Sequence, residues 1–286
     1  MDIDAGIPMD TKVEPRPRPR ALVLTGFGLN CEAETAVALE RAGARAERVH
    51  LSDLLAEPGR LADYQLLAVI GGFSFGDHIA AGRALAIRLR HGLADELAGF
   101  VAGGGLVIGI CNGFQVLCKL GLLPGFEPFS RGIEQQVTLT HNDSGVFRDD
   151  WVSLRVNPDS PCVFTRGLER LDLPIRHGEG MFMAREPAVL ERLRARGQVV
   201  YQYADETGEP TMDFPANPNG SLEAIAGICD PTGRIFGTMP HPEAFIFPEL
   251  HPDAPRRRAL GLPPPEPMGM RIFENAVRFT CGAGAG

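Results

Sequence analysis

Residues 21–120 alternate between short apolar runs and longer segments that mix apolar and polar residues. The apolar runs predict buried strands and the mixed segments predict helices. The expected strands span 21–25, 45–51, 66–70 and 106–110. The expected helices span 31–42, 79–97 and 112–120. Strands that alternate with helices indicate a mostly parallel sheet covered on both faces, so this half predicts a doubly wound, flavodoxin-like α/β unit.

The second half of the chain has a different pattern, in which short strand-like runs are separated by turn residues such as Asp230-Pro231-Thr232-Gly233. The expected strands span 136–140, 151–156, 173–176, 199–203, 224–229 and 234–238. Short strands joined by turns predict a mixed or antiparallel extension of the same sheet. A long loop over 248–267 and a closing helix over 270–279 complete the pattern.

The first 19 residues form a segment of their own, with prolines at positions 8, 15, 17 and 19 and interspersed arginines. Such a stretch prefers extended conformations and does not pack a core. We therefore expect a disordered tail over 1–19 and a single α/β domain over 20–286.

Composition narrows the class of protein. A formal net charge of -8 leaves no basic footprint for nucleic acid, and no apolar run reaches the length of a membrane span. The six cysteines show neither CxxC nor zinc-finger spacing, and a chain of this length does not need disulfides, which favours the reducing cytoplasm. Phosphate-loop, HExxH and EF-hand motifs are absent from the sequence, so we expect no metal and no cofactor in this chain.

The strongest chemical signal is the sequence Gly-Ile-Cys-Asn-Gly at 109–113, which joins the apolar strand 106–110 to the helix after it. This pattern is that of a nucleophile elbow with Cys111 in the place of serine. A sharp strand-to-helix turn strains the nucleophile's backbone, and the flanking glycines avoid clashes with neighbouring strands. The helix N-terminus favours a thiolate at Cys111. The alternative is a buried structural cysteine, which is the interpretation we give to Cys118.

A base for such a nucleophile is offered by Met-Pro-His-Pro-Glu at 239–243, which follows another expected strand. His241 can accept and return a proton near neutral pH, and the carboxylate of Glu243 can orient the ring through its other nitrogen. On its own this short motif fits a structural turn at least as well as a catalytic site. It gains weight from the elbow far upstream, because catalytic pairs meet in space rather than in sequence.

Glycine-rich residues 71–77 leave the end of strand 66–70 beside the elbow. Their backbone could face a developing oxyanion, with the amide of Asn112 as the second donor. His78 follows this segment. The alternative to an oxyanion role is that the segment is a plain turn. The segment 177–180, which begins with His177, is either a second polar cluster near the site or an ordinary turn.

These motifs in this order resemble the class I (triad) glutamine amidotransferases, and most closely the family of glutaminase subunits of phosphoribosylformylglycinamidine synthase. The residues that carry the resemblance are GGFSFGD (71–77), GICNGFQ (109–115) and MPHPE (239–243), supported by TGFGLNCEAET (25–35), RHGEG (176–180), NPNGS (217–221) and IFENAVRF (272–279). The resemblance covers essentially all of 21–280.

The resemblance implies a carbon–nitrogen ligase subunit that hydrolyses glutamine to glutamate and ammonia. Cys111 would attack the carboxamide, His241 would move the proton, and Glu243 would hold His241. Gly71, Gly72 and Asn112 match oxyanion positions, and Gln115 matches a residue near the bound glutamine.

The family further implies that ammonia passes to a separate synthetase subunit. That subunit would use ATP and magnesium to convert formylglycinamide ribonucleotide to formylglycinamidine ribonucleotide, and a small third subunit would join the complex. Three features depart from the family pattern: the tail 1–19, Ala-Phe-Ile-Phe after Glu243 in place of an arginine, and the long loop 248–268.

Several alternatives stay open at this point. The chain could be a glutaminase for another synthetase or a stand-alone γ-glutamyl hydrolase. It could also be a regulatory module of the same fold without catalysis, although the complete set of Cys111, His241 and Glu243 argues against that. A thiol sensor similar to DJ-1 would use the elbow cysteine but would not need the His-Pro-Glu sequence.

Overall fold

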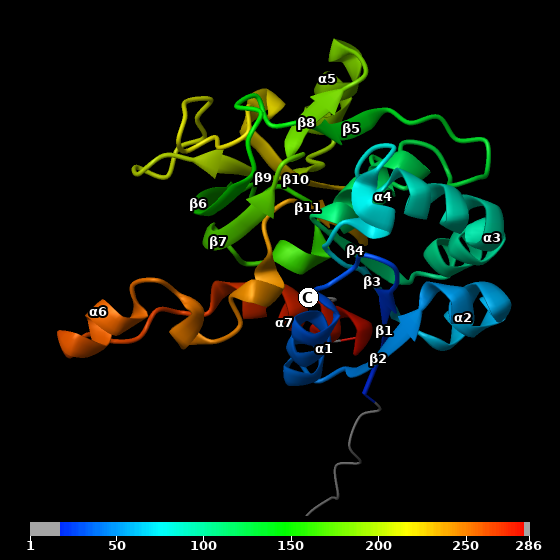
Figure 1. The fold of residues 1–286 in the computed structure, drawn as a ribbon, viewed down its shortest axis with the longest axis horizontal. Helices are drawn as coiled ribbons and strands as arrows, with labels where there is room; N and C mark the ends of the chain where they lie inside the picture. Colours follow the sequence, from blue (N-terminus) through cyan, green and yellow to red (C-terminus); the bar gives the residue numbers. More distant parts are fainter. Residues whose placement is uncertain (1–17, 283–286) are drawn as a thin grey trace, which may run out of the picture.

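The computed structural model describes residues 18–282 as a nine-stranded sheet with flanking helices and a separate two-stranded ribbon (Figure 1). The strand order across the main sheet is β2-β1-β3-β4-β11-β10-β9-β6-β7. None of the helices in this described part of the chain is long and apolar enough to cross a membrane.

Parallel strands make up the first half of the sheet. They are β1 (Arg20–Thr25), β2 (Arg45–His50), β3 (Leu66–Val69), β4 (Leu106–Ile110) and β11 (Ile235–Thr238). Every residue of β3, β4 and β11 is buried, which explains why these strands are apolar throughout. The predicted doubly wound unit is confirmed. The late strand β11 pairs with β4 and so brings a distant part of the chain beside the elbow.

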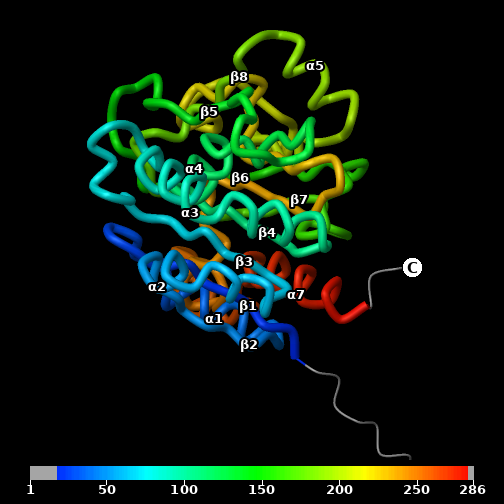
Figure 2. Tube along the Cα trace, turned by 90° about the vertical axis from the view of Figure 1, so that its right-hand side faces the viewer, coloured from blue at the N-terminus to red at the C-terminus, as the bar shows by residue number. Residues whose placement is uncertain are grey.

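Helices cover both faces of this parallel half. They are α1 (Glu32–Arg41), α2 (Leu51–Ala56), α3 (Arg83–Ala102), α4 (Asn112–Leu120) and α7 (Met268–Thr280). Helix α1 packs against α7, and α3 packs against α4. In Figure 2 the α3–α4 pair lies above β3 and the α1–α7 pair lies below it. The sheet edge between the two layers is where ligand sites of doubly wound folds form.

The predicted antiparallel extension is also present. It consists of β10 (Ile225–Cys229), β9 (Val199–Ala204), β6 (Arg148–Val156) and β7 (Arg170–His177). One expected strand of this group was placed wrongly. Residues 137–140 form β5, which pairs only with β8 (Met181–Ala184), outside the main sheet. Both ribbon strands are short, and the alternating burial of β5 is equally compatible with a sheet strand.

Helix boundaries and short helices account for the other differences. The helix expected over 79–97 begins only at Arg83, because Gly82 before it is in the left-handed region. The segment expected as a continuous loop contains α6 (Ala254–Ala259), and α5 (Pro187–Ala195) was not foreseen. Helices of six to nine residues give little periodic signal in a sequence.

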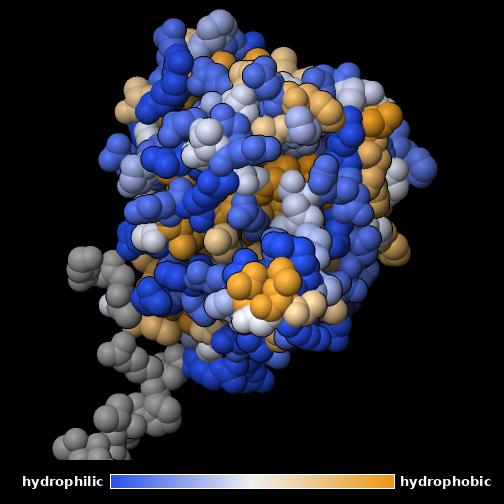
Figure 3. Space-filling view, turned by 90° about the vertical axis from the view of Figure 1, so that its left-hand side faces the viewer, coloured by the Kyte–Doolittle hydropathy of each residue, from blue (hydrophilic) through white to orange (hydrophobic). Residues whose placement is uncertain are grey.

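The segment that carries α6 extends sideways from the sheet (Figure 1). Figure 3 looks at this side of the molecule and shows a mainly hydrophilic surface with an exposed hydrophobic patch. The segment itself exposes Leu250, Leu260 and Leu262. This segment therefore leaves apolar side chains exposed at the side of the molecule.

The expected tail 1–19 lies outside the described residues except for its last two. The guanidinium of Arg18 donates hydrogen bonds to the carbonyl oxygens of Gly43 (3.1 Å) and Ala44 (2.5 Å). Pro19 accepts a backbone hydrogen bond from Arg45. The ordered domain therefore includes Arg18 and Pro19.

Candidate active site

The elbow has the geometry expected from its sequence. Cys111 lies between β4 and α4 with φ 51° and ψ −107°, a strained conformation for a residue with a side chain. A Cβ on Gly113 would lie 1.8 Å from the carbonyl oxygen of Val69. A Cβ on Gly109 would lie 2.8 Å from the carbonyl oxygen of Gly113. Both glycines are therefore required by close backbone approach around the nucleophile.

The parallel pairing of β4 with β11 brings the elbow and the His-Pro-Glu sequence together. Cys111 N donates a 2.7 Å hydrogen bond to the carbonyl of Thr238, the last residue of β11. The chain then turns back over the sheet edge, where His241 N donates to the carbonyl of Pro174 (2.8 Å). His241 and Glu243 are each only 2% exposed.

The imidazole is oriented by the carboxylate as the sequence predicted. Nδ1 of His241 lies 2.6 Å from Oε1 of Glu243. Nδ1 therefore carries a hydrogen and donates a hydrogen bond to the carboxylate. Nε2 of His241 is buried and has no hydrogen-bond partner among the described residues. A Cβ on Gly71 would lie 3.0 Å from Cε1 of His241 and 3.6 Å from Cβ of Cys111. The ring and the thiol thus converge over Gly71.

The charges around His241 favour its protonated form. Burial alone lowers the pKa of His241, but the carboxylate of Glu243 and the thiol of Cys111 outweigh it and raise the pKa well above its usual value. The imidazolium can protonate a departing amine.

The turn that carries the base rests on the last helix. Residues Pro242–Ala244 form a single 3₁₀ turn that contacts α7. A Cβ on Gly269 of α7 would lie 2.0 Å from the carbonyl oxygen of Pro242, so helix and turn are in close contact. Phe245 and Ile246, which follow in place of the arginine usual in the family pattern, are buried and help to hold the turn.

Asn112 and Gln115 form a buried polar chain next to the elbow. Oδ1 of Asn112 accepts a hydrogen bond from the backbone N of Ser74 (3.3 Å), and its Nδ2 donates to Oε1 of Gln115 (2.8 Å). Nε2 of Gln115 in turn donates to the carbonyl of Glu179 (2.6 Å). These bonds tie the 71–77 segment and the 177–180 segment to the first turn of α4.

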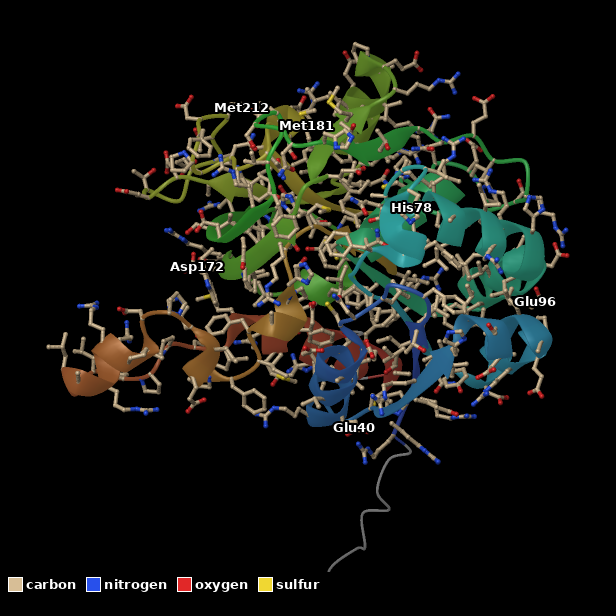
Figure 4. All side chains as sticks on the ribbon, viewed as in Figure 1. Glu40, His78, Glu96, Asp172, Met181 and Met212 are labelled. Atoms are coloured by element: carbon tan, nitrogen blue, oxygen red, sulfur yellow. The ribbon has the colours of Figure 1, made fainter. Side chains whose placement is uncertain are left out.

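The position of Gly72 also depends on close backbone approach. Its φ is +133°, and a Cβ there would lie 2.4 Å from the carbonyl oxygen of Gly28. His78, labelled in Figure 4, lies on the segment that leads into α3. Its ring folds back on its own turn, since a Cβ on Gly76 would lie 2.6 Å from its Nε2. The exposed ring of His78 therefore lies against its own turn.

Of the two interpretations left open for 177–180, the structure supports the polar cluster. The thiol of Cys111 lies 3.6 Å from the carbonyl oxygen of Arg176, directly before this segment. His177 is buried, with Nδ1 3.1 Å from Oδ1 of Asn142, and Oδ1 also accepts from the backbone N of Gly180 (3.0 Å). Asn219 lies 3.5 Å from the other ring nitrogen. Sequence reasoning missed Asn142, although NPNGS gave a signal for Asn219.

We expect His177 to make stability depend on pH. Burial, followed by the nearby charge of His241, lowers the pKa of His177 from 6.5 to about 3. His177 therefore binds a proton more readily in the unfolded state than in the folded state. The stabilisation of the fold that depends on neutral His177 is fully present above pH 6.5 and decreases as pH falls toward 3. Between pH 6.5 and 5 the loss should be about 2 kcal/mol of unfolding free energy.

Urea unfolding of wild type, His177→Gln and His91→Gln at pH 7 and pH 5 checks this expectation. The His177 variant should lose much less stability on acidification than wild type, because glutamine does not titrate. The matched control His91→Gln, at an exposed position of α3, should behave as wild type. Equal acid sensitivity in all three proteins would contradict the assignment.

Sequence reasoning also missed Cys31, the residue directly before α1. A Cβ on Gly71 would lie 3.3 Å from its sulfur, so Cys31 lies against the same point as His241 and Cys111. Burial raises the pKa of the Cys31 thiol, and its contact with His241 opposes this. Its place at the entry to the first helix after β1 is at the carboxyl edge of the sheet, but that place alone does not assign it to the site.

Comparison with known proteins agrees with this geometry. The family description that matches the chain, over residues 18–280, is that of a CobB/CobQ-like glutamine amidotransferase domain. The chain belongs to this glutamine amidotransferase family. The match spans almost all of the described residues, including Cys111, His241 and Glu243.

Similar proteins from several organisms bear the same name, phosphoribosylformylglycinamidine synthase subunit PurQ. The chain is 49% identical over 252 residues to phosphoribosylformylglycinamidine synthase subunit PurQ of Dehalococcoides mccartyi, covering 88% of this chain and 94% of that one. It is 40% identical over 262 residues to the subunit of the same name from Methanococcus maripaludis, covering 89% and 95%.

Solved structures support the amidotransferase fold. A chain of PurLQS from Thermotoga maritima matches with a TM-score of 0.67 and 29% identity, covering 92% of this chain and all of that one. A glutamine amidotransferase from the same organism has a TM-score of 0.52 at 13% identity and shows the shared fold alone. Together with the sheet order, these matches confirm the predicted fold class.

Proposed function

We propose that this chain is a glutaminase that supplies ammonia to an ATP-dependent synthetase in purine biosynthesis. The reaction served would be the conversion of formylglycinamide ribonucleotide to formylglycinamidine ribonucleotide. Relatives named as subunits of that synthase support the pathway. The observation that carries the chemistry is the convergence of Cys111, His241 and Glu243 at one edge of the sheet.

The proposed reaction begins with Cys111 passing its thiol proton to His241 and attacking the carboxamide carbon of glutamine. The oxyanion that forms would accept hydrogen bonds from the backbone amides of Gly72 and Asn112, with Gly71 leaving room for it. His241 donates its proton to the departing nitrogen, and ammonia leaves a γ-glutamyl thioester on Cys111. His241 then takes a proton from water, which hydrolyses the thioester to glutamate and restores the thiol.

Gln115 contributes to this scheme as a positioning residue. Its bond to the carbonyl of Glu179 holds the 176–180 segment against the elbow. That segment, with the carbonyl of Arg176 beside the thiol, would form the wall against which the substrate's aliphatic part lies. The site uses acid–base and covalent chemistry from its own side chains, and we propose no cofactor in this chain.

The partner would be the synthetase subunit, which would hold ATP and magnesium, with a small third subunit in the complex. The solved neighbour with 29% identity is itself part of an assembly called PurLQS. Phe73, next to Gly72, and Phe147 expose about half of their surface, and their ring centroids are 6.4 Å apart. Exposed aromatic residues beside a site fit a surface that a partner covers. We propose that the single domain expected over 20–286, extended by Arg18 and Pro19, carries this role.

A test measures glutamate release from glutamine by the chain alone, by the synthetase alone and by both together. We expect slow release by the chain alone and a large increase with the synthetase, formylglycinamide ribonucleotide and ATP. With glutamine labelled by ¹⁵N at the amide, the label should appear in the amidine product. Glutamate release without transfer of the label would show a glutaminase that serves another acceptor.

A further inference from the structure

A second thiol lies at the active site. Cys31 is half-buried, and its sulfur, a ring nitrogen of His241 and a carboxylate oxygen of Glu243 lie within 4.8 Å of one another. The other half-buried cysteine, Cys281, lies just after α7 at the far end of the chain. The proposed hydrolysis of glutamine does not need Cys31, so its position calls for a separate explanation.

The histidine between the two thiols is arranged like a metal ligand. Nδ1 of His241 is bonded to Glu243, while Nε2 is buried and unpartnered among the described residues. A carboxylate on one ring nitrogen with the other nitrogen free is the usual arrangement of a histidine that binds zinc. The carboxylate fixes the ring's orientation and increases the donor strength of Nε2.

The two thiols approach this imidazole from different chain segments. Cys31 precedes α1, and Cys111 precedes α4. A Cβ on Gly71 would meet the sulfur of Cys31 at 3.3 Å, Cβ of Cys111 at 3.6 Å and the ring of His241 at 3.0 Å. The missing side chain at Gly71 lets these three groups approach one another. The sulfur of Cys111 lies 3.6 Å from the carbonyl oxygen of Arg176 and is not in the group of ligand atoms that lie within 4.8 Å of one another, so zinc binding requires the Cys111 side chain to rotate toward Nε2 of His241.

We propose that Cys31, Cys111 and His241 bind a zinc ion, with Glu243 orienting the histidine, and that the bound zinc switches the site off. Two sulfurs and one imidazole nitrogen suit zinc, whereas magnesium and calcium require oxygen ligands. A water molecule would complete the tetrahedron. Binding takes up one Zn²⁺ and requires Nε2 of His241 without a proton, so two protons leave the site in all, one for each thiol that becomes a thiolate, and no electron transfer is involved.

Zinc bound in this way competes with glutamine. It occupies the nucleophile's sulfur and the nitrogen that must carry the proton, so the bound enzyme cannot attack a carboxamide. The inhibition rests on the proposed glutaminase function, but metal binding does not. The two parts can therefore be tested separately.

Binding is tested with cobalt(II), which reports tetrahedral thiolate ligation by its intense visible absorption. The full-length wild-type chain should develop this absorption at one equivalent of cobalt and lose it when zinc is added. Cys31→Ser should bind at least about 100-fold more weakly, since even an outer partner is worth about 10- to 100-fold in affinity. Cys281→Ser, the matched half-exposed thiol, should bind as wild type. Urea unfolding shows whether each variant is folded.

Equal cobalt affinity in wild type and Cys31→Ser would overturn the proposal, because it would mean that Cys31 is not a ligand. A spectrum without thiolate ligation in the wild type would overturn it as well. Both results are independent of whether the chain hydrolyses glutamine.

Inhibition is tested on the complex with the synthetase, in the presence of the phosphine reductant TCEP. Zinc should suppress glutamate release by wild type, glutamine should protect, and EDTA should restore activity. Cys31→Ser should keep its activity at zinc concentrations that stop wild type and Cys281→Ser. Activity that is lost without reductant and restored by TCEP, but not by EDTA, would overturn the zinc switch in favour of a disulfide between Cys31 and Cys111.

Discussion

Replacement of Cys111 by alanine is expected to lower the rate of glutamate release by at least about 10⁴-fold, because the covalent step loses its nucleophile. Alanine keeps the backbone of the elbow, and the thiol is nearly buried, so the fold should persist. The synthetase in the complex should still make product when free ammonia replaces glutamine. That retained reaction would show that the variant assembles and is impaired only in ammonia release.

The matched control for this variant is Cys118→Ala, on the same helix as the elbow. Cys118 is fully buried in α4, and burial raises the pKa of its thiol far above the usual value, so it is inert as a nucleophile. Its replacement should cost stability but leave the rate per folded molecule near that of wild type. Substantial glutamate release by Cys111→Ala, or equal losses in both variants, would remove Cys111 from its proposed role.

Replacement of Gly113 by alanine is expected to destabilise the fold by about 3 kcal/mol, which is large for a single added methyl group. The new Cβ would lie 1.8 Å from the carbonyl oxygen of Val69, at the end of the buried strand β3. A backbone atom cannot rotate away as a side chain can. Strand and helix must separate, and the elbow must move with them.

Urea unfolding free energies of Gly113→Ala and Gly99→Ala measure this effect directly. Gly99 lies within α3, and a Cβ there would meet no atom within 4 Å. Alanine at that exposed helical position should stabilise the protein by up to about 1 kcal/mol. A small or equal effect of the two substitutions would contradict the close packing of β3 against α4.

The parallel half of the fold and the three segments of the site could be predicted because their signals are local. Buried parallel strands are apolar throughout; Cys111 follows such a run directly, and His241 follows another after Met239 and Pro240. Parallel strands that end at the same edge bring such residues together. The β5–β8 ribbon was not predicted because its short strands carry the same pattern as strands of the main sheet.

Cys31 and Asn142 could not be assigned for a different reason. Each lies beside the site because of the path that a connecting segment takes. No repeating pattern of apolar and polar residues predicts that path. Cys31 depends on how the chain leaves β1, and Asn142 depends on the bends around β5. Only the packed structure shows that both reach the surroundings of Cys111.

The contact between α7 and the His-Pro-Glu turn has a consequence for synthesis of the protein. The nucleophile's strand and helix leave the ribosome early, whereas the turn that carries His241 rests on Gly269, near the end of the chain. The contact between this turn and Gly269 therefore forms only after α7 has emerged. A growing chain that has not yet reached α7 carries the thiol of Cys111 before the turn of His241 rests on its last packing partner.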